Sequence, residues 1–134
     1  MSTKFGNKEE EVDPSSLFVS ETDSKGIITY ANKTFLNIAG YSKEELLGKP
    51  HNTIRHPFMP KTIFEDLWKT IQKGDTWDEI IINQTKSGGY YWVKANVFKS
   101  KNPDGSVKYI SVRIKASEQE IEDAIKKYTA LQGN

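Results

Sequence analysis

The second half of the chain contains three long segments with β-strand composition, separated by short turn sequences. Residues 77–85, 90–100 and 107–115 are rich in β-branched and aromatic side chains, which favour strands. The intervening sequences, KSGG at 86–89 and KNPDG at 101–105, are typical of hairpin loops. Because consecutive strands joined by hairpins pair antiparallel, this half of the chain predicts an antiparallel sheet.

The first half predicts two short strands followed by short helices. Residues 17–20 and 26–30 have strand composition, and the sequence between them has hairpin turn chemistry. Asn32 is placed to cap a helix. Ser42, with a glutamate three positions later, has the pattern of a capping box for a second short helix.

Two further segments have helical periodicity. Residues 62–73 carry a set of apolar side chains on one helical face: Ile63, Phe64, Leu67, Trp68 and Ile71. The segment after Ser117 has glutamates at its start and lysines later, which suits the helix dipole. Its apolar stripe contains Ile121, Ala124, Ile125, Tyr128 and Leu131. The element order predicts an α+β domain: a five-stranded antiparallel sheet with short helices on one face and a C-terminal helix.

Composition narrows the classes of function. The length of 134 residues fits one domain, and 19 basic against 18 acidic residues argues against nucleic-acid binding. The absence of cysteine excludes disulfides, thiolate metal sites and cysteine nucleophiles. With no signal peptide, no long apolar run and no catalytic motif, we expect a cytoplasmic domain that does not insert into a membrane and is not an enzyme.

Residues 50–60 are the strongest candidate for a binding segment. They contain both histidines, His51 and His56, together with Arg55 and three of the five prolines of the chain. Prolines fix φ and bias the preceding residues away from helix, so the segment is rigid and irregular. Such a segment can hold polar groups around a ligand, and the alternative is a polar surface turn.

The motifs of the first half resemble those of a PAS domain: DSKGIITYANKTF at 23–35, then GYSKEELLGKP at 40–50. A closer resemblance is to the PAS domain of bacterial aerotaxis receptors and energy-taxis proteins. The residues that carry it include PHN at 50–52, RHP at 55–57, MPK at 59–61 and YWV at 91–93.

This resemblance implies a redox or energy sensor that binds FAD and signals to a chemotaxis transducer or another signalling protein, with a homodimer as a further expectation. The polar start of the chain is expected to be a flexible leader (1–16), and the resemblance implies a PAS sensor domain (17–116) followed by a C-terminal signalling helix (117–134). A ligand-free interaction module is the competing interpretation.

The resemblance also implies a set of cofactor-binding residues: Arg55, His56, Trp68, Asn83, Asn32 and His51. Arg55 can pair with a pyrophosphate or a flavin carbonyl, and His56 can donate to the ring edge or hold the loop. Strand alternation places Asn83 on the same face as Trp77 and Ile81. A buried amide there would pair with a flavin ring, or with neighbouring backbone.

Four positions leave alternatives open. Aerotaxis receptors commonly have aspartate where this chain has Phe58, so Phe58→Asp is expected to strengthen flavin retention. Strand alternation places Arg113 on the same face as Tyr109 and Ser111. This face is turned either toward solvent or toward the pocket, where some flavin PAS domains keep a glutamine. Haem is the alternative cofactor, with His51 or His56 as axial ligand. A light-driven flavin–cysteinyl adduct is excluded because the chain has no cysteine.

Overall fold

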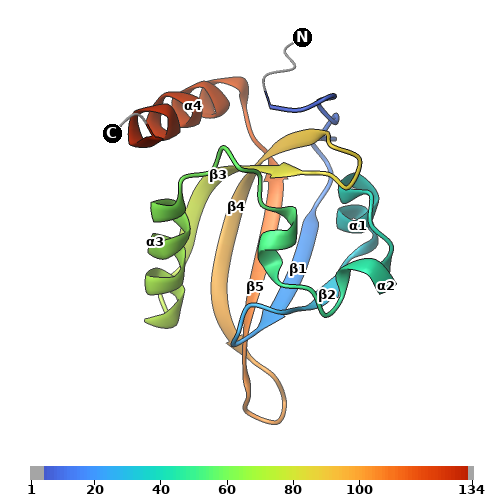
Figure 1. Ribbon diagram of the computed structural model, residues 1–134. Coiled ribbons are helices and arrows are strands. Elements are labelled where there is room, and N and C mark those ends of the chain that lie inside the picture. Colours follow the sequence, from blue (N-terminus) through green and yellow to red (C-terminus); the bar gives the residue numbers. More distant parts are fainter. Residues whose placement is uncertain (1–4, 133–134) are drawn as a thin grey trace.

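The computed structural model describes residues 5–132. Its central layer is one antiparallel sheet with the strand order β2-β1-β5-β4-β3 (Figure 1). The elements in chain order are β1 (Phe18–Asp23), β2 (Ile28–Ala31), α1 (Lys33–Ala39), α2 (Lys43–Leu46), the 3-10 helix η1 (His51–Ile54), α3 (Lys61–Gln72), β3 (Trp77–Gln84), β4 (Tyr90–Lys101), β5 (Val107–Lys115) and α4 (Glu118–Gln132). The predicted α+β fold with five antiparallel strands is confirmed.

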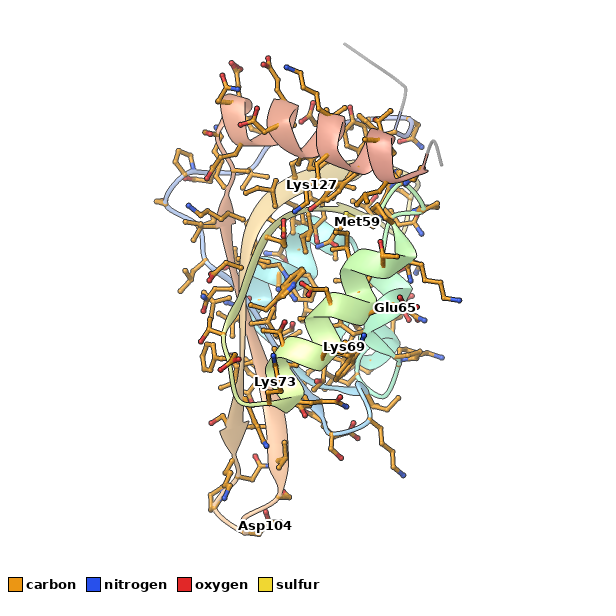
Figure 2. The ribbon with its side chains drawn as sticks, turned by 90° about the vertical axis from the view of Figure 1, so that its left-hand side faces the viewer. Met59, Glu65, Lys69, Lys73, Asp104 and Lys127 are labelled. Carbon is orange, nitrogen blue, oxygen red and sulfur yellow. The ribbon has the colours of Figure 1, made fainter. Side chains whose placement is uncertain are left out.

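The helices α1, α2 and α3 cover one face of the sheet, and α4 crosses one end of it (Figures 1 and 2). Helix α3 turns its apolar residues toward the sheet, burying Ile63 and Ile71. The charged side chains of Glu65 and Lys69, and of Lys73 just after the helix, are exposed (Figure 2). The predicted amphipathic helix is therefore confirmed, with boundaries shifted by one residue.

Local capping agrees with the sequence pattern. The Asn32 side chain accepts a hydrogen bond from the Phe35 backbone N–H, and α1 ends at Gly40 with a left-handed φ of 80°. Ser42 and Glu45 form the complete capping box of α2. These caps position the chain that leads into the proline-rich segment.

The register of β3 and β4 defines the face beneath the helices. Trp77 pairs with Val97 and Ile81 pairs with Val93, so their side chains lie on the same face. The β5 residue Arg113 pairs with Ala95 and lies on this face as well. The predicted alternation of the long strands is confirmed.

The N-terminal segment differs from the flexible leader that its polarity predicts. Phe5 packs against the core, and Val12 is part of it. The Glu10 N–H donates to the Tyr90 carbonyl (2.8 Å), and the Tyr90 N–H donates to the Lys8 carbonyl (2.9 Å). Two apolar side chains and backbone hydrogen bonds to the start of β4 therefore pack residues 5–12 against the domain. Residues 1–4 lie outside the described range.

Candidate functional site

A cavity of about 260 Å³ lies between α3, the 50–55 segment and the helix-covered face of the sheet. Its apolar walls come from α3 and from the three long strands, and the residues that form them are Phe64, Leu67, Trp68, Ile71, Trp77, Ile81, Ala95, Val97 and Tyr109. The volume is near the lower end, roughly 300 Å³, of small-molecule sites. The cavity therefore suits one flat ring system with apolar faces.

The charged side chains of the lining are basic, and its other polar residues are neutral. Lys25, His51 and Arg55 line the cavity, as do the hydroxyls of Ser20 and Ser111. Among the described residues no aspartate or glutamate lines it, although the chain has nearly equal numbers of acidic and basic residues. The lining therefore favours a ligand that is rich in acceptors or carries negative charge.

Arg113 lies directly behind this polar lining and is 0% exposed. Its Nη1 donates to the Phe18 carbonyl (3.2 Å), and its Nη2 contacts Ser20 Oγ (2.5 Å) and His51 Nε2 (3.0 Å). The guanidinium lies 4.5 Å from the Phe35 ring centroid. Within residues 5–132 it makes no ion pair, and its Nε has no hydrogen-bond partner.

His51 is a neutral hydrogen-bond acceptor for Arg113. Burial, and then the charge of Arg113, lower the pKa of His51 to about 3. Burial lowers the pKa of Arg113 to about 10, so the guanidinium still carries its charge at neutral pH. The pair therefore holds one positive charge, on Arg113, and a neutral imidazole that lines the cavity.

Trp68 and Arg55 also line the cavity. The Trp68 ring meets the buried Tyr109 edge to face, with 5.5 Å between ring centroids. Arg55 stacks over the Phe64 ring at 4.3 Å and donates to the Met59 carbonyl at 3.3 Å. These contacts orient both side chains and leave further donors of the Arg55 guanidinium for a ligand.

His56 does not line the cavity; it holds the N-terminal segment instead. Its Nε2 donates to the Phe5 carbonyl (2.5 Å), and its Nδ1 accepts from the Phe58 N–H (2.9 Å). Of the two roles that the sequence left open for His56, the structure therefore has the loop-holding one. Both ring nitrogens of His56 are hydrogen-bonded, and His51 Nε2 accepts from Arg113. Either histidine would therefore have to give up a hydrogen bond to coordinate a haem iron.

Phe58 belongs to an aromatic cluster on the other side of the sheet from the cavity. We call Phe5, His56, Phe58, Tyr90 and Trp92 the aromatic cluster. The Phe58 ring lies 4.9 Å from Phe5 and 6.3 Å from Trp92, centroid to centroid. Phe58 is absent from the cavity lining. The structure therefore gives no support to an aspartate here orienting Arg55 within the site.

Asn32 and Asn83 are held by the protein rather than lining the cavity. Asn32 accepts from the Phe35 and Val19 N–H groups and donates to the Leu17 carbonyl. The buried Asn83 amide lies 3.5 Å from the Tyr91 hydroxyl, and its backbone bridges to Arg55. Asn83 thus ties the binding segment to β3.

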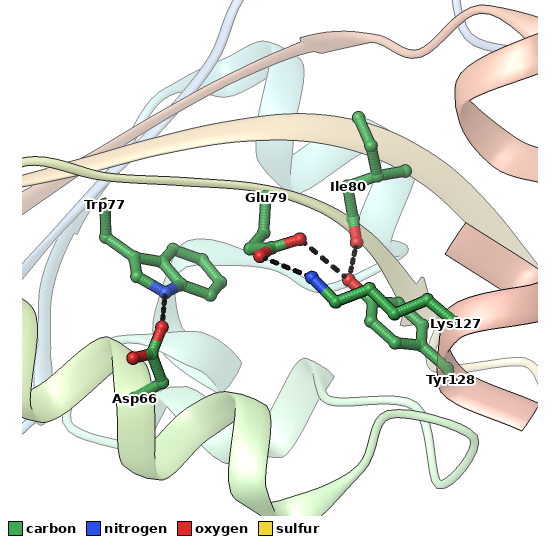
Figure 3. A network of polar contacts seen from close by, with 6 residues as sticks. All are labelled: Asp66, Trp77, Glu79, Ile80, Lys127 and Tyr128. Atoms are coloured by element: carbon green, nitrogen blue, oxygen red, sulfur yellow. Dashed lines mark hydrogen bonds and ion pairs between the residues drawn. The ribbon is translucent and has the colours of Figure 1, made fainter. Parts of the chain in front are cut away.

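Helix α4 docks on β3. The Tyr128 hydroxyl donates to the Ile80 carbonyl and lies 3.3 Å from a carboxylate oxygen of Glu79, and Lys127 forms an ion pair with Glu79 at 2.9 Å (Figure 3). Tyr128 also meets Phe58 of the aromatic cluster. Most of the predicted apolar stripe therefore packs within the domain, whereas Leu131 is 44% exposed.

Sequence reasoning missed the hydroxyls of Ser20 and Ser111 and left Arg113 undecided. Strand alternation carried the signal for Ser111 and Arg113, because both share a face with the buried Tyr109. The burial of that face depends on α1 and the 50–55 segment, which lie far away in the sequence. The three predicted residues that the structure brings together at the cavity are His51, Arg55 and Trp68.

The structure is an α+β domain with a cavity between α3 and the sheet. The sequence pattern of the PAS fold matches residues 28–114, and the chain belongs to the PAS family. It is 42% identical over 113 residues to the aerotaxis receptor of Escherichia coli (strain K12), covering 84% of this chain and 22% of the receptor. It is 32% identical over 98 residues to the nitrogen fixation regulatory protein of Klebsiella pneumoniae, covering 73% and 20%. The chain thus spans about a fifth of these relatives.

Solved structures agree with this fold. One, described as "Flavin Analogue Sheds Light on Light-Oxygen-Voltage Domain Mechanism", has a TM-score of 0.71 at 22% identity, covering 87% of this chain and 89% of that one. The dark structure of the blue-light photoreceptor Aureochrome1 LOV has a TM-score of 0.67 at 25% identity, covering 87% and 84%. Over residues 5–132, no helix has both the length and the apolar character needed to span a bilayer.

Proposed function

We propose that this chain is a redox-sensing PAS module that binds a flavin, FAD, in the cavity beneath α3. The observation that carries the proposal is the cavity itself: apolar and aromatic walls, a basic polar lining, and the unpaired Nε of Arg113 behind it. A planar ring with carbonyl acceptors along one edge meets both requirements. The similarity to an aerotaxis receptor supports the redox role.

In this proposal each cavity residue has a defined task. The flavin supplies reversible electron transfer when it is bound. Trp68 and the β3–β4 wall exclude water from the ring faces, while His51 and Ser111 meet its polar edge. Arg55, with the exposed Lys25, holds the pyrophosphate of FAD, which would distinguish FAD from FMN.

The proposed output passes from residues 50–60 to the chain ends. A shift in Arg55 reaches Met59 through their hydrogen bond, and Phe58 contacts both the N-terminal Phe5 and Tyr128 of α4. The receiver is a chemotaxis transducer or another signalling protein, and the domain itself has no enzymatic role. Two discrete arrangements of this segment would make the domain a switch.

Absorbance spectroscopy tests the proposal. The protein is purified with added FAD or FMN, passed through a desalting column, and then reduced with dithionite. Retained flavin absorbance that bleaches on reduction is the expected result. A colourless protein would instead indicate a ligand-free interaction module, and a Soret band would indicate haem.

The choice of FAD over FMN has its own test. We expect Arg55→Met to weaken FAD binding about tenfold, through loss of charge-assisted hydrogen bonds, and to change FMN binding less. Lys69→Met is the matched control, because Lys69 lies on the exposed side of α3 (Figure 2). Equal losses of both flavins in Arg55→Met would show that Arg55 does not contact the pyrophosphate.

A further inference from the structure

Arg113 is a buried cation surrounded by neutral groups. Its polar contacts are a backbone carbonyl, a serine hydroxyl and a neutral imidazole, and Phe35 covers one face of the guanidinium. A buried charge is costly unless it is paired. Within residues 5–132 no carboxylate pairs with it, and the cavity beside it is where a compensating negative charge could be bound.

The charge of Arg113 reaches the cavity through two groups. Ser20 and His51 both contact Arg113 Nη2, and both line the cavity. His51 accepts through Nε2, so its ring proton is on Nδ1, and the imidazole adds no second charge. The wall between guanidinium and cavity is therefore one residue thick, and among the described residues it contains no acidic side chain to screen the charge.

We propose that Arg113 sets the redox potential of the bound ligand by favouring the form that carries one more negative charge. This inference rests on the proposed flavin function. When an external electron donor gives the bound flavin an electron without an accompanying proton, the site gains one negative charge, and Arg113 is its counter-charge. In a site of low effective dielectric, this attraction favours the reduced form over the oxidised one.

The test is the midpoint potential of the bound flavin, measured by spectroelectrochemistry on the full chain. We expect Arg113→Met to weaken binding of the reduced form relative to the oxidised form at least tenfold, which lowers the one-electron potential by ~59 mV or more. Arg113→Lys keeps the charge and is expected to retain most of the wild-type potential. Lys115→Met is the matched control, because it removes one exposed cation from the same strand.

A second pair of variants covers the case in which Arg113→Met fails to fold. His51→Glu places a carboxylate beside Arg113 and neutralises its charge without removing it, whereas His51→Gln leaves that charge in place. We expect the midpoint potential of the His51→Glu protein to be lower than that of the His51→Gln protein. The difference should again correspond to at least a tenfold change in the relative binding of the reduced and oxidised flavin.

The outcomes separate this inference from the function on which it rests. A wild-type protein that retains no flavin overturns the proposed function and the role of Arg113 with it. A protein that binds flavin with the same potential in wild type and Arg113→Met overturns only the role of Arg113. If Arg113→Met does not fold, equal potentials in His51→Glu and His51→Gln have the same meaning. An equal drop in Lys115→Met would assign the effect to net charge, and also overturns the role of Arg113.

Discussion

The cavity wall around Arg113 and the aromatic cluster around Phe58 lie on opposite faces of the same sheet. They differ in how many of their buried polar groups have hydrogen-bond or ion-pair partners within the protein. In the aromatic cluster, both nitrogens of His56 are hydrogen-bonded, and the rings of Phe5, Phe58 and Trp92 pack on one another. At the cavity wall, Arg113 has no ion-pair partner within residues 5–132, and open volume lies beside it. In the aromatic cluster the protein supplies the hydrogen-bond partners of the buried imidazole, whereas at the cavity wall the buried guanidinium keeps one N–H without a partner among residues 5–132.

The largest effect expected from this contrast is on stability. Trp92 is 3% exposed and supports the aromatic cluster, so Trp92→Ala should lower the free energy of unfolding by about 3–5 kcal/mol. Trp68→Ala is the matched variant at the cavity. Because Trp68 is only half-buried, its replacement should cost less stability but abolish most flavin binding. Urea unfolding and flavin dialysis of both variants measure the contrast, and a Trp68 variant that is the less stable of the two would contradict it.

Phe58→Asp sharpens the same comparison. Its ring packs against Phe5, Trp92 and Tyr128, so a carboxylate there should destabilise the domain by about 2–4 kcal/mol, less than a fully buried aromatic because Phe58 is half-buried. Flavin affinity of the folded fraction should not rise. Tighter flavin binding with unchanged thermal unfolding would show that position 58 serves the cavity after all.

The neutral state of His51 predicts a pH dependence. Its pKa of about 3 in the folded protein lies below the ordinary 6.5, so the unfolded state binds the proton more tightly. The stability from this group is complete above about pH 6.5 and is lost progressively as pH falls toward 3. At pH 5 the loss should be about 1–2 kcal/mol, discounted for partial exposure. His51→Gln should flatten the unfolding profile between pH 6.5 and about 4; an unchanged slope would assign the pH dependence to other groups.

The smallest effect is expected from Arg113→Met in the ligand-free protein. Removing a desolvated cation offsets the loss of its hydrogen bonds, so the free energy of unfolding should change by less than about 1 kcal/mol. Thermal unfolding without flavin measures this. A loss as large as that of Trp92→Ala would mean that Arg113 is part of the scaffold, and the contrast between the two faces would not hold.

The sequence predicted the sheet, the helices, the caps and the division of the strands into two faces. Each of these depends on neighbours within a few residues: the Asn32 cap, the Ser42 capping box, and the alternation that places Asn83 with Trp77 and Ile81. The composition of residues 50–60, and then the resemblance, made this stretch the candidate binding segment, and His51 and Arg55 do line the cavity.

Only the tertiary structure decided which side chains of that segment face the cavity. An irregular, proline-rich stretch has no repeating pattern, so its orientation depends on distant partners. His56 turns away because its Nε2 meets the Phe5 carbonyl 51 residues earlier, and Arg113 is buried because it bonds to Phe18, 95 positions away. Local periodicity determines elements and faces, whereas the burial of a polar group is set by contacts that exist only once the chain has closed around it.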